Sequence, residues 1–516
     1  MLELNRRGFV RAAGATALAA PTLGDLLFSK SARAAIGDTL TIAYNVTLPA
    51  WDPTTGPAAV NPATMAIYKS VFDQYLDQSP NLTKIPGLLT EWGWNADRTK
   101  VHFTVRDGAA WHDGKPITAE DIVWNFKRAG NPKTGNPVGF AWGSVGNFKI
   151  DGNRVTADIK RYLPTFWNRM AFLAAYVLPP HYYERVGKAG FEKAPLGSGP
   201  YKVDAYERGS FARLKANKNY WGGAPAFETV VFKFVTDSSS RVAEIERGSS
   251  DLTFDVPYEE YDRLRKKPGL VGVSSPISDV AMIFFNDIGP MKDENVRRAA
   301  VHAVDKKVIV ERLLRGYATP IDTLLAPQYI GYDPSIRTPY DPALAKRLLA
   351  KSGYSTSNPV EFTIQTTRGY KPKDYETVQA IAGMWRKVGI KANIEVYEIA
   401  KHFALRAQDK LAPAAFYNWG NSTADPESST AYAVYGPSRH SVWDGKIVAE
   451  MIKPLLTMKD DAKRFKEYVK VNRYIAEHGI ILPLWQYHQP VVYKEGLDFT
   501  SHLANYILAH KIKRKG

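Results

Sequence analysis

The chain has no cysteine among its 516 residues. Disulfide bridges, thiolate metal sites and cysteine nucleophiles are therefore excluded. A G-x-S-x-G elbow, an H-E-x-x-H helix and a dinucleotide-type glycine fingerprint are also missing, and the ten histidines show no metal-ligand spacing. We therefore expect no cofactor and no bound metal, and we expect that the protein is not an enzyme.

Long apolar runs are also lacking. The N-terminal run at 12–28 is interrupted by two glycines, a proline and an aspartate, so it is too broken to span a bilayer. It follows NRRGFVR at 5–11 and precedes a small-x-small site that ends at Ala34. We predict a twin-arginine signal peptide over residues 1–34, cleaved near Ala34, and export to the periplasm. An ordinary N-terminal amphipathic helix with chance arginines is the alternative.

Acidic residues are fewer than basic ones, with 52 Asp and Glu against 68 Lys and Arg. The formal net charge is +16, of which +13 remains once residues 1–34 are removed. The basic residues are scattered, apart from the short tail KIKRKG at 511–516. Such a surface suits an anionic solute or an acidic membrane, and the lack of a long basic block argues against nucleic acid. The remaining length of about 480 residues allows two or three domains.

Hydrophobic periodicity alternates along the chain. The segments 38–44 and 100–106 alternate apolar and polar residues, which predicts strands. The segment 61–76 has apolar residues at helical spacing, which predicts a helix. This alternation of strands and helices indicates an α/β protein.

The segment WHDGKPITAEDIVWNFKR at 111–128 combines a turn with a helix start. Thr118 and Asp121 have the spacing of a capping box, with Asp a weaker partner than Glu. Ile122, Val123 and Phe126 would then form the buried stripe of the helix. The segment predicts an architectural unit and carries no chemistry by itself.

The run at 90–128 that ends with this segment resembles the hallmark of the family 5 extracellular solute-binding proteins, receptors that deliver peptides, opines, nickel and other solutes to ABC importers. The resemblance continues in order along nearly the whole mature chain. It is carried by PLGSGPYKVDAYERGSFARLKANKNYWGG at 195–223, RVAEIERGSSDLTFDVP at 241–257, FFNDIGPMKDENVRRAAVHAVDKKVIVERLLRGYATP at 284–320, YDPALAKRLLAKSGY at 340–354 and MWRKVGIKANIEVYE at 384–398.

The resemblance implies a two-lobed periplasmic binding protein fold (type II, cluster C-like), with an extra subdomain in lobe I and a hinge between the lobes. The hinge strands would lie near SSPISDVAMIFFND and LWQYHQPVVY. The implied parts are lobe I at 36–70, 191–274 and 490–516, its insertion subdomain at 71–190, and lobe II at 275–489.

The implied function is that of a monomeric periplasmic receptor. It would clamp a peptide or peptide-like solute between the lobes and pass it to the permease and ATPase subunits of an ABC transporter. A non-peptide solute, such as an opine, a sugar or another anionic compound, is the alternative. A Tat-exported enzyme and a binding protein held at the membrane or peptidoglycan are further classes.

For the ligand, the resemblance implies an arginine that takes a carboxylate, and TTRGYKPKD places it at Arg368. A solvated loop cation is the competing interpretation. Peptide binders carry an acid after the tryptophan matched by Trp419, and that position falls at Ser422, beside Asn421. Asp425 matches a later Asp-Pro turn, where it would cap a helix. Without an acid a free ammonium is disfavoured, and a shifted loop that presents Asp425 would reverse this.

Four tryptophans lie in predicted loops or strand ends near the lobe junctions: Trp51, Trp142, Trp419 and Trp485. A flat ring can stack on a sugar or peptide plane, or face a cation. Core filling is the competing interpretation for each of them, and Trp419 is the strongest ligand candidate. GSGPYK at 197–202 lacks the Walker spacing, so we expect a structural turn there and not a phosphate loop.

Overall fold

The computed structural model describes residues 37–438, 441 and 443–515. The predicted signal peptide and its cleavage near Ala34 lie outside these residues. Helices and strands alternate along the described chain, which confirms the predicted α/β class. None of the helices within the described ranges has the length and apolar character needed to cross a membrane.

One large sheet dominates the described part of the chain and contains 11 strands. In spatial order they are β15 (Ile390–Val396), β14 (Val360–Thr366), β16 (Ala414–Gly420), β12 (Leu270–Phe285), β17 (Ile481–Lys494), β11 (Leu252–Phe254), β1 (Thr39–Tyr44), β10 (Thr229–Phe234), β9 (Phe211–Ala216) and β8 (Tyr201–Glu207), with β13 (Ala318–Pro320) pairing with β17.

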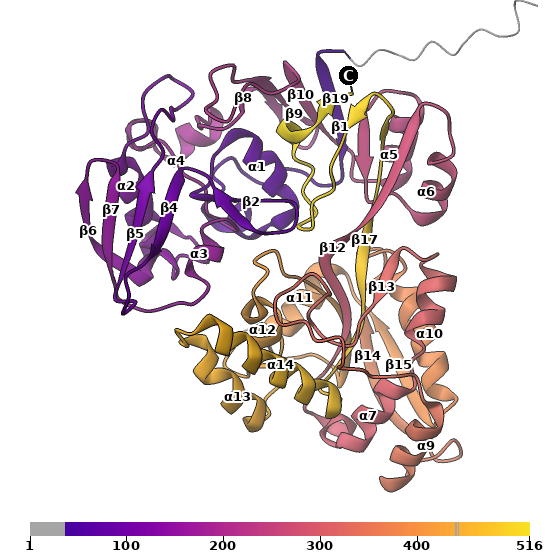
Figure 1. Cartoon of the computed structure of the whole chain (residues 1–516). Helices are drawn as coiled ribbons and strands as arrows, with labels where there is room; N and C mark the ends of the chain where they lie inside the picture. Colours follow the sequence, from indigo (N-terminus) through magenta and orange to yellow (C-terminus); the bar gives the residue numbers. More distant parts are fainter. Residues whose placement is uncertain (1–36, 439–440, 442, 516) are drawn as a thin grey trace, which may run out of the picture. The chain divides into compact units, whose positions relative to one another are not determined.

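The two longest strands, β12 and β17, join the two halves of this sheet. They pair antiparallel from Leu270↔Lys494 to Phe284↔Ile481 and run side by side in Figure 1. We call β11, β1, β10, β9 and β8 the first half, and β16, β14 and β15 the second half. The register shifts between Pro276 and Val280, so the ladder is interrupted where the strands pass from one half to the other.

A separate four-stranded sheet is formed by residues 89–159. Its order is β4 (Leu89–Trp94), β5 (Lys100–Val105), β7 (Arg154–Ile159) and β6 (Val145–Asp151). Two small ribbons complete the strands: β2 (Leu76–Gln78) with β3 (Lys84–Pro86), and β18 (Leu497–Asp498) with β19 (Lys513–Arg514).

The helices surround these sheets. They are α1 (Met65–Val71), α2 (Ala119–Gly130), α3 (Phe166–Arg169), α4 (Pro180–Lys193), α5 (Ser238–Glu246), α6 (Tyr258–Leu264), α7 (Glu294–His302), α8 (Lys306–Val308), α9 (Pro342–Lys351), α10 (Asp374–Arg386), α11 (Ile399–Ala407), α12 (Thr430–Val434), α13 (Lys446–Ile452) and α14 (Asp461–Glu477).

Buried apolar side chains gather in several clusters. One lies between the four-stranded sheet and α2, where the rings of Phe103 and Phe126 stack with their centroids 5.5 Å apart. Another lies under the second half of the large sheet, where Phe362 meets Trp385. The largest combines side chains of the first half, of β12 and β16, of α12 to α14 and of the C-terminal segment. With no cysteine available, this packing must hold the fold.

The predicted strands at 38–44 and 100–106 are confirmed as β1 and β5. The helix predicted over 61–76 is shorter, because α1 ends at Val71 and Phe72 is extended. The Val71 carbonyl accepts the N–H of Gly199 at 2.9 Å, so a distant segment takes the place of the next helical turn.

The segment 111–128 is the architectural unit that its sequence predicts. Thr118 and Asp121 form the capping box at the start of α2, and Asp121 also accepts the indole N–H of Trp111 at 3.1 Å. His112 accepts the N–H of Gly197 and donates from Nε2 to the Gly199 carbonyl. Burial lowers the pKa of His112 to about 4, so the ring is neutral in this clamp.

Candidate functional site

The carboxyl ends of two sets of parallel strands face the same stretch of β12 and β17. In the first half, β1 pairs parallel with β10 and β11; in the second half, β14 pairs parallel with β15 and β16. The antiparallel registers of β11 on β17 and of β16 on β12 direct both sets toward the shift at Pro276–Val280. Ligands of open α/β sheets bind at carboxyl strand ends, so we call the loops after β1, β11, β14 and β16, with residues 276–280, the strand-end site.

A half-buried ion pair lies in the strand-end site. The Nζ atom of Lys371, in the loop after β14, is 2.6 Å from Oδ2 of Asp279 on β12. Burial acts to lower the pKa of Lys371, but the charge of Asp279 outweighs this effect and the pKa is raised. A Cβ on Gly420 would lie 2.6 Å from Oδ1 of Asp279, so glycine at this position leaves room for the carboxylate.

A second acid comes from the first half of the sheet. Asp255 follows β11, and its carboxylate accepts hydrogen bonds from Asn45 at 2.7 Å and from Gln489 at 3.2 Å. Asn45 follows β1 and Gln489 lies on β17. These three residues are far apart in the chain and meet only in the folded protein.

Ser422 and Asn421 are buried at the end of β16. The Ser422 hydroxyl is 3.2 Å from the hydroxyl of Ser278, and its carbonyl accepts a hydrogen bond from Gln78 at 2.6 Å. Asn421 donates to the Asp425 carbonyl at 2.9 Å. Ser422 therefore lies in the strand-end site, whereas Asn421 braces the loop that follows.

The carboxylate of Asp425 is occupied by structural partners. It caps the turn Pro426–Ser428 by accepting the N–H of Glu427. Both of its oxygens also accept from the fully buried guanidinium of Arg464. Burial opposes the charged form of Arg464, but the hydrogen bonds that it donates to Asp425 outweigh this effect and raise the pKa of Arg464.

This ion pair extends toward the four-stranded sheet. Glu427 lies 3.5 Å from Arg464 and 3.3 Å from Arg169, which belongs to α3. Burial raises the pKa of Glu427. The network thus ties the loop after β16 to the 89–169 region.

Arg368 lies in the loop after β14 and is exposed, with its guanidinium 3.9 Å from the ring centroid of Tyr375. It forms no ion pair with any carboxylate in the described ranges. The arginine is thus held against an aromatic face at the edge of the strand-end site.

Of the four tryptophans, Trp419 is the one at the strand-end site. It is half-buried at the end of β16, and its indole N–H donates to the Ser428 carbonyl at 2.7 Å. Trp51 is buried against Tyr206, and Trp485 is buried on β17.

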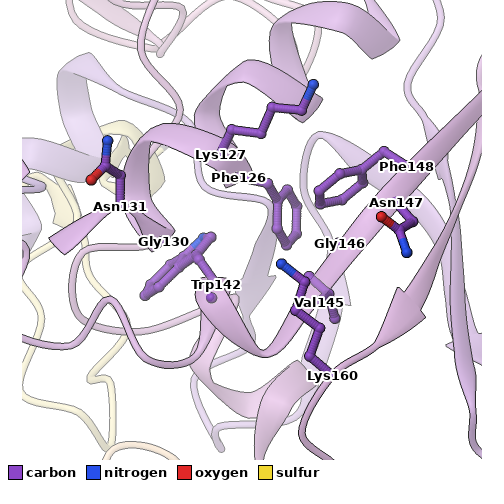
Figure 2. Close-up of a pocket in the computed structure, with 11 residues that line it drawn as sticks. Phe126, Lys127, Gly130, Asn131, Trp142, Val145, Gly146, Asn147, Phe148 and Lys160 are labelled. Atoms are coloured by element: carbon purple, nitrogen blue, oxygen red, sulfur yellow. The ribbon is translucent and has the colours of Figure 1, made fainter.

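Trp142 is placed elsewhere. It belongs to the core of the four-stranded sheet and lines a cavity of about 240 Å³ between α2 and β6. Figure 2 shows this cavity with Phe126 and Phe148 beside it and the Lys160 side chain extending toward the rings. This cavity lies away from the strand ends.

The sequence interpretation missed four residues that the fold brings to the strand-end site: Asn45, Asp255, Asp279 and Lys371. A signal was available for two of them, because Asn45 and Asp255 directly follow segments that read as strands. For Asp279 and Lys371 the pairing depends on contacts between distant segments. No group of three or more potential metal-binding side chains occurs in the described part of the chain.

Residues 83–440 match the family described as "Bacterial extracellular solute-binding proteins, family 5 Middle". The chain is 28% identical over 420 residues to the dipeptide-binding protein of Escherichia coli, covering 74% of this chain and 77% of that protein. It is 26% identical over 388 residues to heme-binding protein A of Haemophilus influenzae, covering 70% of each.

Its fold also superposes on solved structures. A dipeptide-binding protein from Pseudoalteromonas sp. SM9913, solved in complex with Met-Leu, gives a TM-score of 0.78 at 20% identity and covers 92% of this chain and 100% of that chain. The two-lobed fold expected from the sequence is thereby confirmed.

Replacing the buried acid of the structural network tests this placement. We expect Asp425→Ala to lower the free energy of unfolding by about 3–5 kcal/mol, because Arg464 would remain buried without its partner. Chemical denaturation would measure the change. The control is Glu467→Ala on α14, because Glu467 pairs with Lys470 at the surface. For this variant we expect the free energy of unfolding to fall by about 0.5 kcal/mol. Equal effects of the two substitutions would contradict the structural role of Asp425.

Proposed function

This chain belongs to the family 5 bacterial extracellular solute-binding proteins, and from that premise we propose that it is the periplasmic receptor of an ABC importer. It captures a peptide or peptide-like solute and delivers it to the permease and ATPase subunits in the inner membrane. The observation that carries this proposal is the meeting of two sets of carboxyl strand ends at the register shift of β12 and β17. As a receptor, the protein returns its ligand unchanged, and it acts as a monomer.

The proposed division of the chain follows the same geometry. Lobe I comprises 36–70, 191–274 and 490–516 with the insertion subdomain at 71–190, and lobe II comprises 275–489. The register shift between Pro276 and Val280 supports a hinge there. Export occurs by the twin-arginine pathway, with cleavage of the signal peptide near Ala34.

A non-peptide solute is the second candidate. It is favoured by Ser422, which has no charge where peptide binders of the family have an acid, and by Asp425, whose carboxylate is already paired with Arg464. A similar chain is a heme-binding protein, so membership of the family leaves the ligand class open.

Native mass spectrometry of the mature protein taken from periplasm tests the function. We expect a bound small molecule that is released unchanged on denaturation, with a peptide or peptide-like mass. A released opine, sugar or anionic solute would replace the peptide proposal by the second candidate. Conversion of the bound molecule into a product on incubation would contradict the receptor function.

Closure about the hinge gives a second prediction. Saturating ligand should reduce the radius of gyration in small-angle scattering, because the closed state makes contacts with the ligand from both lobes. The ligand-free protein, stripped by partial unfolding and refolding, is the reference. An unchanged radius at saturation would contradict a clamp mechanism.

Arg368 gives a third prediction. We expect Arg368→Ala to weaken binding of a carboxylated ligand by about 10- to 100-fold, the loss typical of charge-assisted hydrogen bonds, with an unchanged melting temperature. Isothermal titration calorimetry would measure the affinity. Arg386→Ala removes the same charge from the exposed end of α10 and serves as the matched control. Unchanged affinity in Arg368→Ala would refute the assignment.

A further inference from the structure

Asp255 occupies a strained backbone position at the strand-end site. Its φ is +50°, in the left-handed region that residues other than glycine adopt at a cost and mainly as single residues. Such conformations persist where the surrounding structure holds them, and they cluster at functional positions. The position of Asp255 therefore calls for a local cause.

A buried arginine holds this backbone. Arg241 on α5 donates from Nη1 to the carbonyls of Val235 and Thr236, and from Nη2 to the carbonyl of Asp255 at 3.3 Å. The guanidinium thus contacts backbone oxygens at the ends of β10 and β11. It forms no ion pair with the Asp255 carboxylate.

Among the described residues, the hydrogen bonds that orient the carboxylate come from neutral donors. Asn45 and Gln489 each donate one side-chain amide hydrogen bond to it, one to each oxygen. No cation lies within 4 Å of it in the described part of the chain, and Lys371 is already paired with Asp279. Burial raises the pKa of Asp255. The more distant charges of Lys371 and Arg241 act to lower it, but the pKa remains above its usual value.

A half-buried carboxylate without a cation is unfavourable, because the charge has lost part of its hydration and gained no counter-ion. Each oxygen of an ionised carboxylate can accept about two hydrogen bonds, and each oxygen of Asp255 accepts one from these amides. Acceptor capacity therefore remains on a side chain whose orientation is already fixed. This combination suits a ligand that brings its own positive charge.

We propose that Asp255 receives a cationic group of the ligand, an ammonium or a guanidinium, at the strand-end site. The inference rests on the proposed receptor function and names the ligand class: a solute with at least one primary ammonium or guanidinium group. Ser422, after β16 in the second half of the sheet, carries no charge. Under this proposal Asp255, after β11 in the first half, supplies the acid instead. The ligand would thereby contact both halves, with Asp255 on one side and Trp419 on the other.

The test uses two ligand pairs in which one member carries an ammonium group and the other lacks it: dialanine with its N-acetyl form, and N-acetyl-lysyl-alanine with N-acetyl-norleucyl-alanine. We expect the wild-type protein to bind the ammonium-bearing member of at least one pair. Asp255→Asn should weaken binding of that member by about 10-fold or more, because a charge-assisted hydrogen bond is lost. The affinity for the member without an ammonium group should stay unchanged. Calorimetry measures both affinities.

Two further variants keep the test decisive. Asp255→Gly removes the acid and suits the positive φ, so it should give the same selective loss in a protein at least as thermostable as the wild type. Asp237→Asn is the matched control: this acid also follows a strand of the first half, β10, and caps α5 through the N–H of Ser240. Since asparagine is an equally good cap, it should change neither affinity.

The outcomes separate the inference from the function on which it rests. An equal loss of affinity for ligands with and without an ammonium group, or no loss, would overturn the role of Asp255. A wild-type preference for the members without an ammonium group would overturn it too, while the receptor function stands. If no member of the panel binds, the peptide-like ligand class and this inference both fail, and a solute released in native mass spectrometry would still identify a receptor.

Discussion

The pairing of β12 with β17 connects everything else in this protein. The two strands run antiparallel through both halves of the large sheet, and each half adds its own parallel strands to them. Because the parallel strands β1, β10 and β11 of the first half and β14, β15 and β16 of the second half point their carboxyl ends at the same stretch, the loops after β1, β11, β14 and β16 meet there. The interrupted register between Pro276 and Val280 leaves that stretch with fewer ladder hydrogen bonds than the rest. The site and the proposed hinge thus have one structural origin.

Charge inside this protein follows two different patterns. Asp425, Arg464, Glu427 and Arg169 form a buried network in which each charge has an opposite partner. Removing one member leaves another uncompensated, which is why such networks hold segments together. Asp255 is the contrasting case, since its hydrogen-bond partners are neutral amides. We interpret the first pattern as structural and the second as a position prepared for a ligand.

The likeness to family members of different ligand class shows where specificity must reside. The dipeptide-binding and heme-binding relatives align over most of this chain, so the fold is compatible with very different ligands. Under the proposed function, we infer that specificity depends on the few side chains at the strand ends. In this chain they combine an uncharged Ser422, an aromatic Trp419 and acids from β12 and the end of β11.

Much of the architecture could be predicted from the sequence alone. The lack of cysteine, the strands β1 and β5, the capping box of Thr118 and Asp121, and the ordered motifs of the family were all visible, because each depends on residues close together in the chain. The helix predicted at 61–76 was too long, since its end is decided by Gly199 from a distant segment. Only the tertiary structure decided which acids are paired and which are not. Asn45, Asp255 and Gln489 meet through strand order, Asp425 is occupied by Arg464 from α14, and Trp142 lies in a separate core. Local periodicity reports how a segment folds, whereas the partner of a charge depends on contacts between segments that are tens to hundreds of residues apart.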